Sequence, residues 1–210
     1  MTGTDLAAVL AGARLLPVLT VPSTATAGPL ADALAAGGAR CAEVTFRTPD
    51  AEQVLKTMAA HGGLAVGAGT VLTAEQAERA VAAGARFVVS PGFDEEVIAK
   101  CRELRVPVVP GIATATELMR AVKAGLDTVK FFPAEPLGGL RTLRALAAPF
   151  PRTRFVPTGG IDADRLAAYL ADPAVLAVGG SWMATAAHLE RGDHQEIRRL
   201  TAEAVERSRG

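Results

Sequence analysis

The sequence lacks net charge, a basic leader and long apolar runs, and each absence excludes a class of protein. Lys+Arg and Asp+Glu balance at 22 each. No net field therefore attracts a polyanion, which argues against nucleic acid as a partner. The N-terminus has no basic start before its apolar stretch, and no run reaches the roughly 18 uninterrupted apolar residues of a membrane helix. We therefore expect a cytoplasmic protein that binds neither nucleic acid nor membranes.

Metal-ligating and nucleophilic residues are also scarce. Cys41 and Cys101 have neither a CxxC spacing nor a histidine partner in sequence, so we expect buried thiols without chemistry. The three histidines, His61, His188 and His194, all lie outside the expected strand ends, which leaves no metal-ligand cluster there. No serine lies in a GxSxG-like turn, so a serine hydrolase lacks its nucleophile. We expect an active site without metal or other cofactor.

Short apolar or β-branched runs recur at fairly even spacing, separated by Ala/Leu/Glu/Arg segments with helical periodicity. Strand and helix repeated eight times is the pattern of a parallel (β/α)8 TIM barrel, for which about 200–250 residues is a common length. We therefore predict one α/β domain over residues 1–210, a TIM barrel with an extra N-terminal helix over Asp5–Ala13. The alternative, a doubly wound open sheet, has no GxGxxG after its first strand to support it. The predicted strands are Leu15–Val21, Cys41–Phe46, Ala65–Val71, Phe87–Pro91, Pro107–Ile112, Thr128–Phe132, Arg154–Thr158 and Val175–Val178.

One lysine interrupts a run that otherwise has the pattern of a buried strand, Thr128-Val129-Lys130-Phe131-Phe132. Alternate strand residues point into a barrel, and active sites form at the carboxyl ends of its strands. If Val129 and Phe131 pack outward on the helices, Lys130 and Phe132 point inward. The other three lysines fall on helical segments. From this pattern alone, a lysine that snorkels to the mouth or pairs with a carboxylate explains Lys130 as well as a functional amine does.

The second strand places further polar side chains on one face. Glu43, Thr45 and Arg47 alternate with apolar Val44 and Phe46. An ion pair of purely structural value is one explanation, but burying several charges costs several kcal/mol and is weak support for stability. This pattern therefore favours a functional site inside the barrel.

Glycines and small polar residues mark the other strand ends. Gly67 and Gly69 would let another group approach the third strand closely, and Thr70 offers a hydroxyl at its rim. The proline of Ser90-Pro91-Gly92 is explained at least as well by turn chemistry as by a substrate contact. Strands seven and eight end in Thr158-Gly159-Gly160 and Gly179-Gly180-Ser181. Two Gly-Gly turns leading into helices at these positions match the phosphate site common in such barrels.

These residue types together indicate carbonyl chemistry. Burial and a nearby guanidinium disfavour the charged form of a lysine, so Lys130 would be available as a nucleophile that forms a Schiff base with a ketone. Glu43 would transfer protons. Arg47, with Thr70, could hold a carboxylate, while the Gly-Gly turns hold a phosphate at the far end. The expected substrate is a 2-keto acid that carries a phosphate several carbons away.

Several sequence blocks, in order along nearly the whole chain, resemble one family. The similarity is to the bifunctional 2-dehydro-3-deoxy-phosphogluconate (KDPG) aldolase / 4-hydroxy-2-oxoglutarate (KHG) aldolase family. The blocks that carry it are Glu43-Val44-Thr45-Phe46-Arg47-Thr48, Gly67-Ala68-Gly69-Thr70-Val71-Leu72, Ser90-Pro91-Gly92, Lys130-Phe131-Phe132-Pro133-Ala134-Glu135, Pro157-Thr158-Gly159-Gly160 and Gly179-Gly180-Ser181-Trp182.

The resemblance implies a class I aldolase of the Entner–Doudoroff pathway, a homotrimer of barrels that yields pyruvate and glyceraldehyde 3-phosphate. It makes Lys130 the Schiff-base residue and Glu43 the proton-transfer residue. The substrate-binding residues expected are Arg47, Thr70, Pro91, Phe132, Thr158, Gly159, Gly160, Gly180 and Ser181. Phe46 stands where close relatives often have leucine, on the outward face. A phosphosugar isomerase or synthase, or a non-catalytic sugar-phosphate sensor, would share the Gly-Gly turns without needing Lys130.

Overall fold

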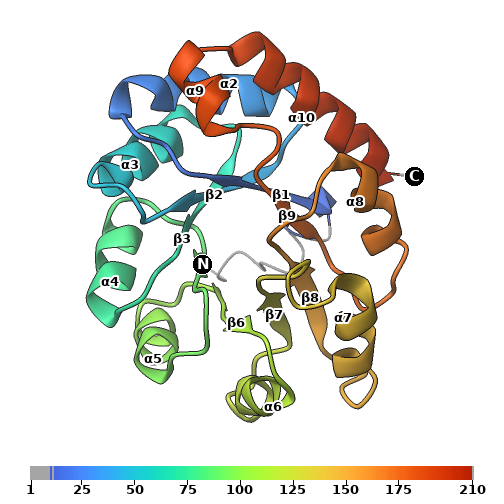
Figure 1. Cartoon of the computed structure of the whole chain (residues 1–210). Helices are drawn as coiled ribbons and strands as arrows, with labels where there is room; N and C mark the ends of the chain where they lie inside the picture. Colours follow the sequence, from blue (N-terminus) through green and yellow to red (C-terminus); the bar gives the residue numbers. More distant parts are fainter. Residues whose placement is uncertain (1–9, 11, 210) are drawn as a thin grey trace.

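The computed structural model describes residue 10 and residues 12–209, and its paired strands all run parallel. One sheet has the strand order β5-β4-β3-β2-β1-β9 and a second has the order β6-β7-β8. Both curve around a common centre with the helices outside (Figure 1). The result is an α/β fold with a parallel half-barrel. The strands are β1 (Leu15–Leu19), β2 (Cys41–Thr45), β3 (Ala65–Gly69), β4 (Val88–Val89), β5 (Val108–Val109), β6 (Gly111–Ile112), β7 (Thr128–Phe131), β8 (Arg154–Pro157) and β9 (Val178–Gly180).

The predicted fifth strand, Pro107–Ile112, is divided into β5 and β6 at Pro110. Proline has no backbone N–H and cannot donate to a ladder. Its carbonyl still accepts a hydrogen bond from the Lys130 N–H at 2.8 Å. The hydrogen-bonded ladder therefore changes sheets at this residue, where the sequence predicts one continuous strand.

The predicted eighth strand begins too early. The sequence places it at Val175–Val178, whereas β9 covers Val178–Gly180 and Val175 makes only an isolated bridge to Phe155. Gly179 and Gly180 are thus strand residues and not a turn. Neighbouring side chains fill the space above them, because a Cβ on Gly180 would lie 1.7 Å from the Trp182 ring.

Helices follow the strands, and several of them begin at residues whose side chains cap the helix. Thr73 accepts a hydrogen bond from the Gln76 N–H, and Thr114 forms a capping box with Glu117. The predicted helix Asp5–Ala13 lies mostly outside the described residues. The described helices are α2 (Ala27–Ala36), α3 (Ala51–His61), α4 (Ala74–Ala82), α5 (Glu95–Glu103), α6 (Ala115–Lys123), α7 (Gly139–Ala147), α8 (Ala163–Leu170), α9 (Ala186–Arg191) and α10 (His194–Arg209), with a short 3₁₀ helix over Thr24–Thr26.

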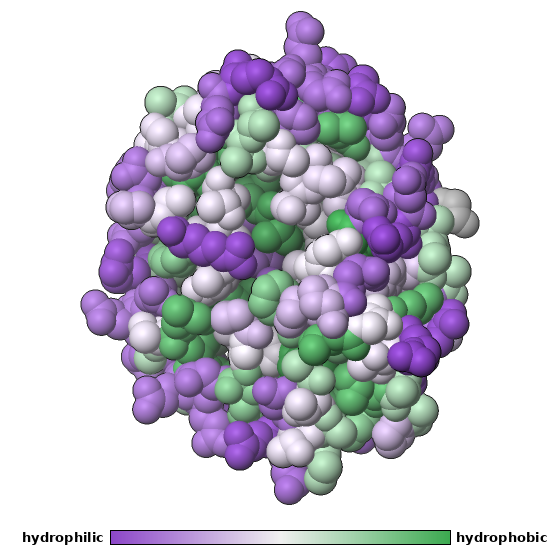
Figure 2. All heavy atoms as spheres, viewed as in Figure 1, coloured by the Kyte–Doolittle hydropathy of each residue, from purple (hydrophilic) through white to green (hydrophobic). Residues whose placement is uncertain are grey.

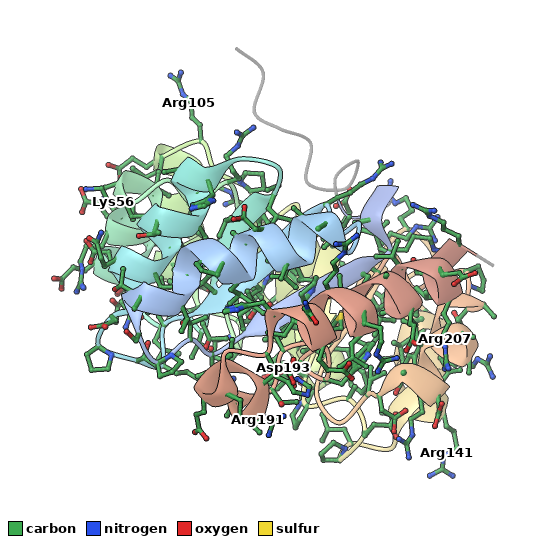
Figure 3. All side chains as sticks on the ribbon, turned by 90° about the horizontal axis from the view of Figure 1, so that it is seen from above. Lys56, Arg105, Arg141, Arg191, Asp193 and Arg207 are labelled. Carbon is green, nitrogen blue, oxygen red and sulfur yellow. The ribbon has the colours of Figure 1, made fainter. Side chains whose placement is uncertain are left out.

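The core has an inner and an outer layer, as the alternation of the strands predicts. Val129, Phe131 and Phe155 pack outward in one cluster with Leu118 and Leu143 of α6 and α7. Charged side chains at the periphery, such as Arg105 and Arg141, project away from the body (Figure 3). In the described part of the chain, every helix is too short or too polar to cross a membrane.

Candidate active site

A cavity of about 360 Å³ opens at the carboxyl ends of the strands. The face in Figure 2 is hydrophilic around its edge and becomes paler and more apolar toward its hollow centre. Eight of the predicted site residues line the cavity, and they come from β2, β7, β8, β9 and the turns that follow. They are Arg47, Lys130, Phe132, Thr158, Gly159, Gly160, Gly180 and Ser181.

Lys130 and Glu43 form a buried ion pair at the inner end of this cavity. The Lys130 Nζ donates to the Glu43 Oε1 at 3.1 Å, and the side chains are 4% and 0% exposed. The Nζ also lies 5.3 Å from the centre of the Phe132 ring, within the range of a cation–π contact. Both side chains point inward, as the alternation predicts, although β2 and β7 belong to different sheets. The structure thus gives Lys130 the partner carboxylate that the sequence pattern allows, and its role as a functional amine stays a prediction.

Glycines on the neighbouring strands make room for the Glu43 side chain and for the loop after β4. Gly69 of β3 pairs with Thr45, and a Cβ on Gly69 would lie 2.0 Å from the Glu43 Oε1. Gly111 stands opposite Lys130, and a Cβ there would lie 2.1 Å from the Pro91 carbonyl oxygen. The predicted close approach to the third strand is therefore made by the Glu43 carboxylate.

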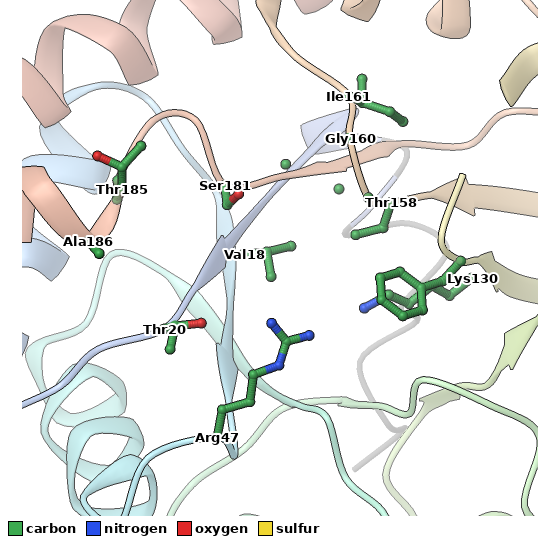
Figure 4. A pocket seen from close by; sticks show the side chains of 15 residues that line it. Val18, Thr20, Arg47, Lys130, Thr158, Gly160, Ile161, Ser181, Thr185 and Ala186 are labelled. Carbon is green, nitrogen blue, oxygen red and sulfur yellow. The ribbon is translucent and has the colours of Figure 1, made fainter. Parts of the chain in front are cut away.

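Arg47 reaches the cavity from the loop after β2. Its guanidinium points toward Val18 at the centre of the site (Figure 4). The Arg47 Nε donates to the Thr70 Oγ1 at 3.2 Å. Thr70 has a φ of 57°, a left-handed conformation that is rare for a β-branched residue and is found at functional sites. Thr70 does not itself line the cavity, so its contact is with Arg47.

The Thr158-Gly159-Gly160 turn forms the wall opposite Arg47. Gly159 and Gly160 have φ values of 103° and 79°, which side chains other than glycine rarely adopt. The turn leads into α8, whose first N–H groups are capped by the Asp162 side chain, which accepts from the Arg165 N–H at 3.0 Å. The glycines face the cavity, and the helix itself is not open toward it.

The second Gly-Gly segment enters the site differently from the prediction. Gly179, Gly180 and Ser181 line the cavity, but α9 begins only at Ala186, after a turn, and has six residues. The expected arrangement of two Gly-Gly turns each opening directly into a helix is therefore wrong for this segment. This wall therefore presents backbone groups and the Ser181 hydroxyl to the cavity.

Sequence reasoning missed several lining residues, and three predicted site residues, Glu43, Thr70 and Pro91, do not line the cavity. Thr20, at the end of β1, lies in the cavity wall and hydrogen-bonds to the Thr45 Oγ1 at 2.9 Å. A polar residue two positions after Val18 in an apolar run was the available signal. Pro91 is half-buried and does not line the cavity. The other unpredicted lining residues are Val18, Ile161, Gly179, Ala184, Thr185 and Ala186.

The two cysteine side chains do not line the cavity. Burial and the nearby Glu43 carboxylate raise the pKa of the Cys41 thiol to about 12, and burial raises that of Cys101 to about 11. Both thiols are buried, as the sequence predicts, and a raised pKa disfavours the reactive thiolate. Among the described residues, no group of three or more His, Cys, Asp or Glu side chains could hold a metal ion.

Comparison with known proteins gives a consistent result. A family model for the KDPG and KHG aldolases matches residues 6–200. The 2-dehydro-3-deoxy-phosphogluconate aldolase of Treponema pallidum is 50% identical over 194 residues, covering 92% of each chain. The KHG/KDPG aldolase of Escherichia coli is 44% identical over 204 residues, 97% of this chain and 96% of that one.

The backbone also closely matches that of a solved structure. The KDPG aldolase of Legionella pneumophila, with pyruvate captured as a covalent carbinolamine intermediate, superposes with a TM-score of 0.92 at 38% identity. The alignment covers 96% of this chain and 98% of that one. With the family model and the relatives, this similarity extends over the strands that carry Glu43 and Lys130. The chain belongs to the KDPG and KHG aldolase family.

Proposed function

We propose that this protein is a class I aldolase that cleaves 2-dehydro-3-deoxy-6-phosphogluconate into pyruvate and glyceraldehyde 3-phosphate, with Lys130 as the Schiff-base residue. The observation that carries the proposal is the buried pair in which the Lys130 Nζ lies 3.1 Å from the Glu43 carboxylate at the inner end of the cavity. A buried amine beside a proton acceptor is suited to nucleophilic attack on a ketone. No cofactor is needed, because the lysine itself becomes the electron sink.

In this mechanism Glu43 moves the protons. It accepts the proton of the Lys130 ammonium, and the free amine adds to the C2 carbonyl of the substrate. The protonated Glu43 carboxyl gives this proton to the departing hydroxyl of the carbinolamine, and loss of water leaves an iminium. The Glu43 carboxylate then removes the C4 hydroxyl proton, the C3–C4 bond breaks, and the electron pair passes to the iminium nitrogen as the aldehyde leaves. The protonated carboxyl then returns a proton to C3 of the enamine, and water releases pyruvate.

The two ends of the cavity bind the two ends of the substrate. Arg47, held by Thr70, faces the cavity and would pair with the substrate carboxylate next to the ketone. The Gly159-Gly160 turn and Ser181, on the opposite wall, would donate hydrogen bonds to the phosphate. Phe132, Thr158 and Gly180 fill the wall between them. Pro91 would act through the loop that packs on Gly111.

Cleavage of 4-hydroxy-2-oxoglutarate to pyruvate and glyoxylate is proposed as a second activity of the same site. Its keto-acid end is the same, so Lys130, Glu43 and Arg47 would act on it unchanged. Its other end is a carboxylate, which can use the same donors less completely than a phosphate does. The bifunctional name of the E. coli relative supports this extension.

At the level of architecture we propose a single domain that closes as a full (β/α)8 barrel, with an N-terminal helix at its base. Two isolated bridges, Phe155 to Val175 and Thr158 to Gly179, support closure between β8 and β9. On the other side only Pro110 separates β5 from β6.

We further propose, because of the family resemblance, that the protein is a cytoplasmic homotrimer. Analytical ultracentrifugation tests the trimer.

One coupled assay tests the proposed activity. Lactate dehydrogenase and NADH report pyruvate released from the gluconate-derived phosphorylated substrate, its galactonate-derived stereoisomer and 4-hydroxy-2-oxoglutarate. We expect turnover of the first and, more slowly, of the third. A phosphosugar isomerase or a sugar-phosphate sensor would release no pyruvate from any of them, and that result would overturn the proposal.

A further inference from the structure

Outside the cavity wall, Glu135 joins the loop after β7 to the Gly159-Gly160 turn. The Glu135 N–H donates to the Gly159 carbonyl at 3.0 Å, and the Ala134 N–H donates to the Thr158 carbonyl at 2.8 Å. A trans peptide is planar, and its C=O and N–H point to opposite sides. Anchoring these two carbonyls therefore turns the N–H groups of Gly159 and Gly160 away from the loop. Both glycines line the cavity, so the loop after β7 sets the direction of its backbone donors.

Two residues of α8 contact the two carboxylate oxygens of Glu135. The Tyr169 hydroxyl donates to the Glu135 Oε1 at 2.5 Å, and the Arg165 Nε lies 3.3 Å from the Oε2. Arg165 and Tyr169 are four residues apart on α8 and so share one helical face. Arg165 also pairs with Asp162, the residue that caps this helix. Burial and the Glu135 carboxylate raise the pKa of Tyr169 above its usual value, so the tyrosine stays protonated and remains a donor.

Two glycines make room for the Glu135 side chain. A Cβ on Gly160 would lie 2.8 Å from the Glu135 Cβ. A Cβ on Gly139 would lie 2.9 Å from the Glu135 Oε1 and 3.0 Å from the Tyr169 hydroxyl. Backbone and side chain of Glu135 are thus both packed against the turn. The loop that carries Glu135 comes directly after Lys130 and Phe132 in the sequence, so its contacts with the turn are linked to the reaction site.

We propose that Glu135, held by Tyr169 and Arg165, is a positioning residue that aims the Gly159 and Gly160 donors at the phosphate end of the substrate. It keeps those donors at a fixed position relative to the amine of Lys130. This inference rests on the proposed function and assigns a role to a network that touches no substrate. Loosening the network should weaken recognition of the phosphate and leave the pyruvyl chemistry intact.

The test compares two substrates on Tyr169→Phe and Glu135→Gln. Tyr169→Phe removes one hydrogen bond to the carboxylate, and Glu135→Gln removes the charge that both contacts share. Both variants nearly keep the side-chain volume. We expect kcat/KM for the phosphorylated substrate to fall roughly 2- to 30-fold relative to that for 4-hydroxy-2-oxoglutarate, the range for residues that act on a site through others. The change should lie mainly in KM, and borohydride trapping of pyruvate on Lys130 should match that of the wild type.

Asp172→Asn is the matched control, because Asp172 also pairs with an arginine, Arg144, at 2.7 Å, but beyond the other end of α8. It should leave the substrate ratio unchanged even if it lowers stability. An unchanged ratio in both Tyr169→Phe and Glu135→Gln would overturn the inference while the proposed function stands. A wild-type enzyme that neither traps pyruvate nor cleaves the phosphorylated substrate would overturn the proposed function and this inference with it.

Discussion

Replacing Glu43 by glutamine separates the chemical from the structural role of the buried pair. The substitution keeps the size of the side chain in the space that Gly69 leaves open, so it creates no cavity. It removes a carboxylate that is fully buried and lies 3.1 Å from the Lys130 Nζ. Removing one partner of a buried ion pair typically costs about 3–5 kcal/mol, because the other charge is left uncompensated. An amide oxygen can still accept from Lys130, so we expect the lower end, about 3 kcal/mol in the free energy of unfolding.

The double variant Glu43→Gln/Lys130→Met provides the stability control. Replacing a whole buried pair by hydrophobic groups of similar volume is often neutral, and here the buried charge is removed although the amide introduced by Glu43→Gln loses its partner, so the double variant should recover part of the loss in urea unfolding. In the coupled pyruvate assay, the single variant Glu43→Gln should lose about 10²–10⁴-fold in kcat, the usual contribution of a positioned acid–base group. It should still trap pyruvate with borohydride. An unchanged kcat would leave Glu43 only a structural partner, and a double variant as unstable as the single one would refute the charge argument.

The other predictions concern the two ends of the substrate and the pH dependence of stability. Arg47→Ala should weaken all 2-keto acid substrates alike, since the carboxylate is common to them; a defect confined to phosphorylated substrates would mean that the two ends are reversed. Ser181→Ala should lower kcat/KM for the phosphorylated substrate by roughly 10- to 150-fold, the range for a hydrogen bond to a charged group, and affect 4-hydroxy-2-oxoglutarate less; equal losses would contradict a phosphate contact. Burial raises the pKa of Glu117, but hydrogen bonds from Ala113 and Thr114 outweigh it and lower that pKa below its usual value. The stabilisation by ionised Glu117 is therefore present above the unfolded-chain pKa of about 4.3 and is lost as the pH falls. Glu117→Gln should then lower the free energy of unfolding more at pH 7 than at pH 3, as measured by urea unfolding. Equal losses at the two pH values would refute this pH dependence.

Strand alternation alone was enough to place the two central residues. Successive strand side chains point to opposite faces, so apolar Val129 and Phe131 on one side require Lys130 on the other. The same reasoning on the second strand turns Glu43 inward beside Val44. The 3.1 Å distance between the two groups could not be predicted, because it depends on how β2 and β7 face each other across the barrel.

Strand register and side-chain packing explain why the sequence did not predict the places of Thr20 and of Gly179 and Gly180. Thr20 is in the cavity because β1 pairs with β2 so that Val18 stands opposite Glu43, and an alternation pattern does not specify that register. Gly179 and Gly180 suggested a turn, but Thr158 and the Trp182 ring occupy the space above them and keep them in β9. The place of each glycine in the fold is set by its neighbours across the barrel, which local propensity does not identify.

Trapping with borohydride tests the central claim most directly. The wild-type protein is incubated with pyruvate and borohydride, digested, and mapped by mass spectrometry, with Lys130→Ala as the control. We predict one reduced pyruvyl group per chain on Lys130 and none on the control, because among the described residues only the Lys130 amine is buried beside a carboxylate that can accept its proton. A label on Lys56, Lys100 or Lys123, or stoichiometric trapping by Lys130→Ala, would contradict it.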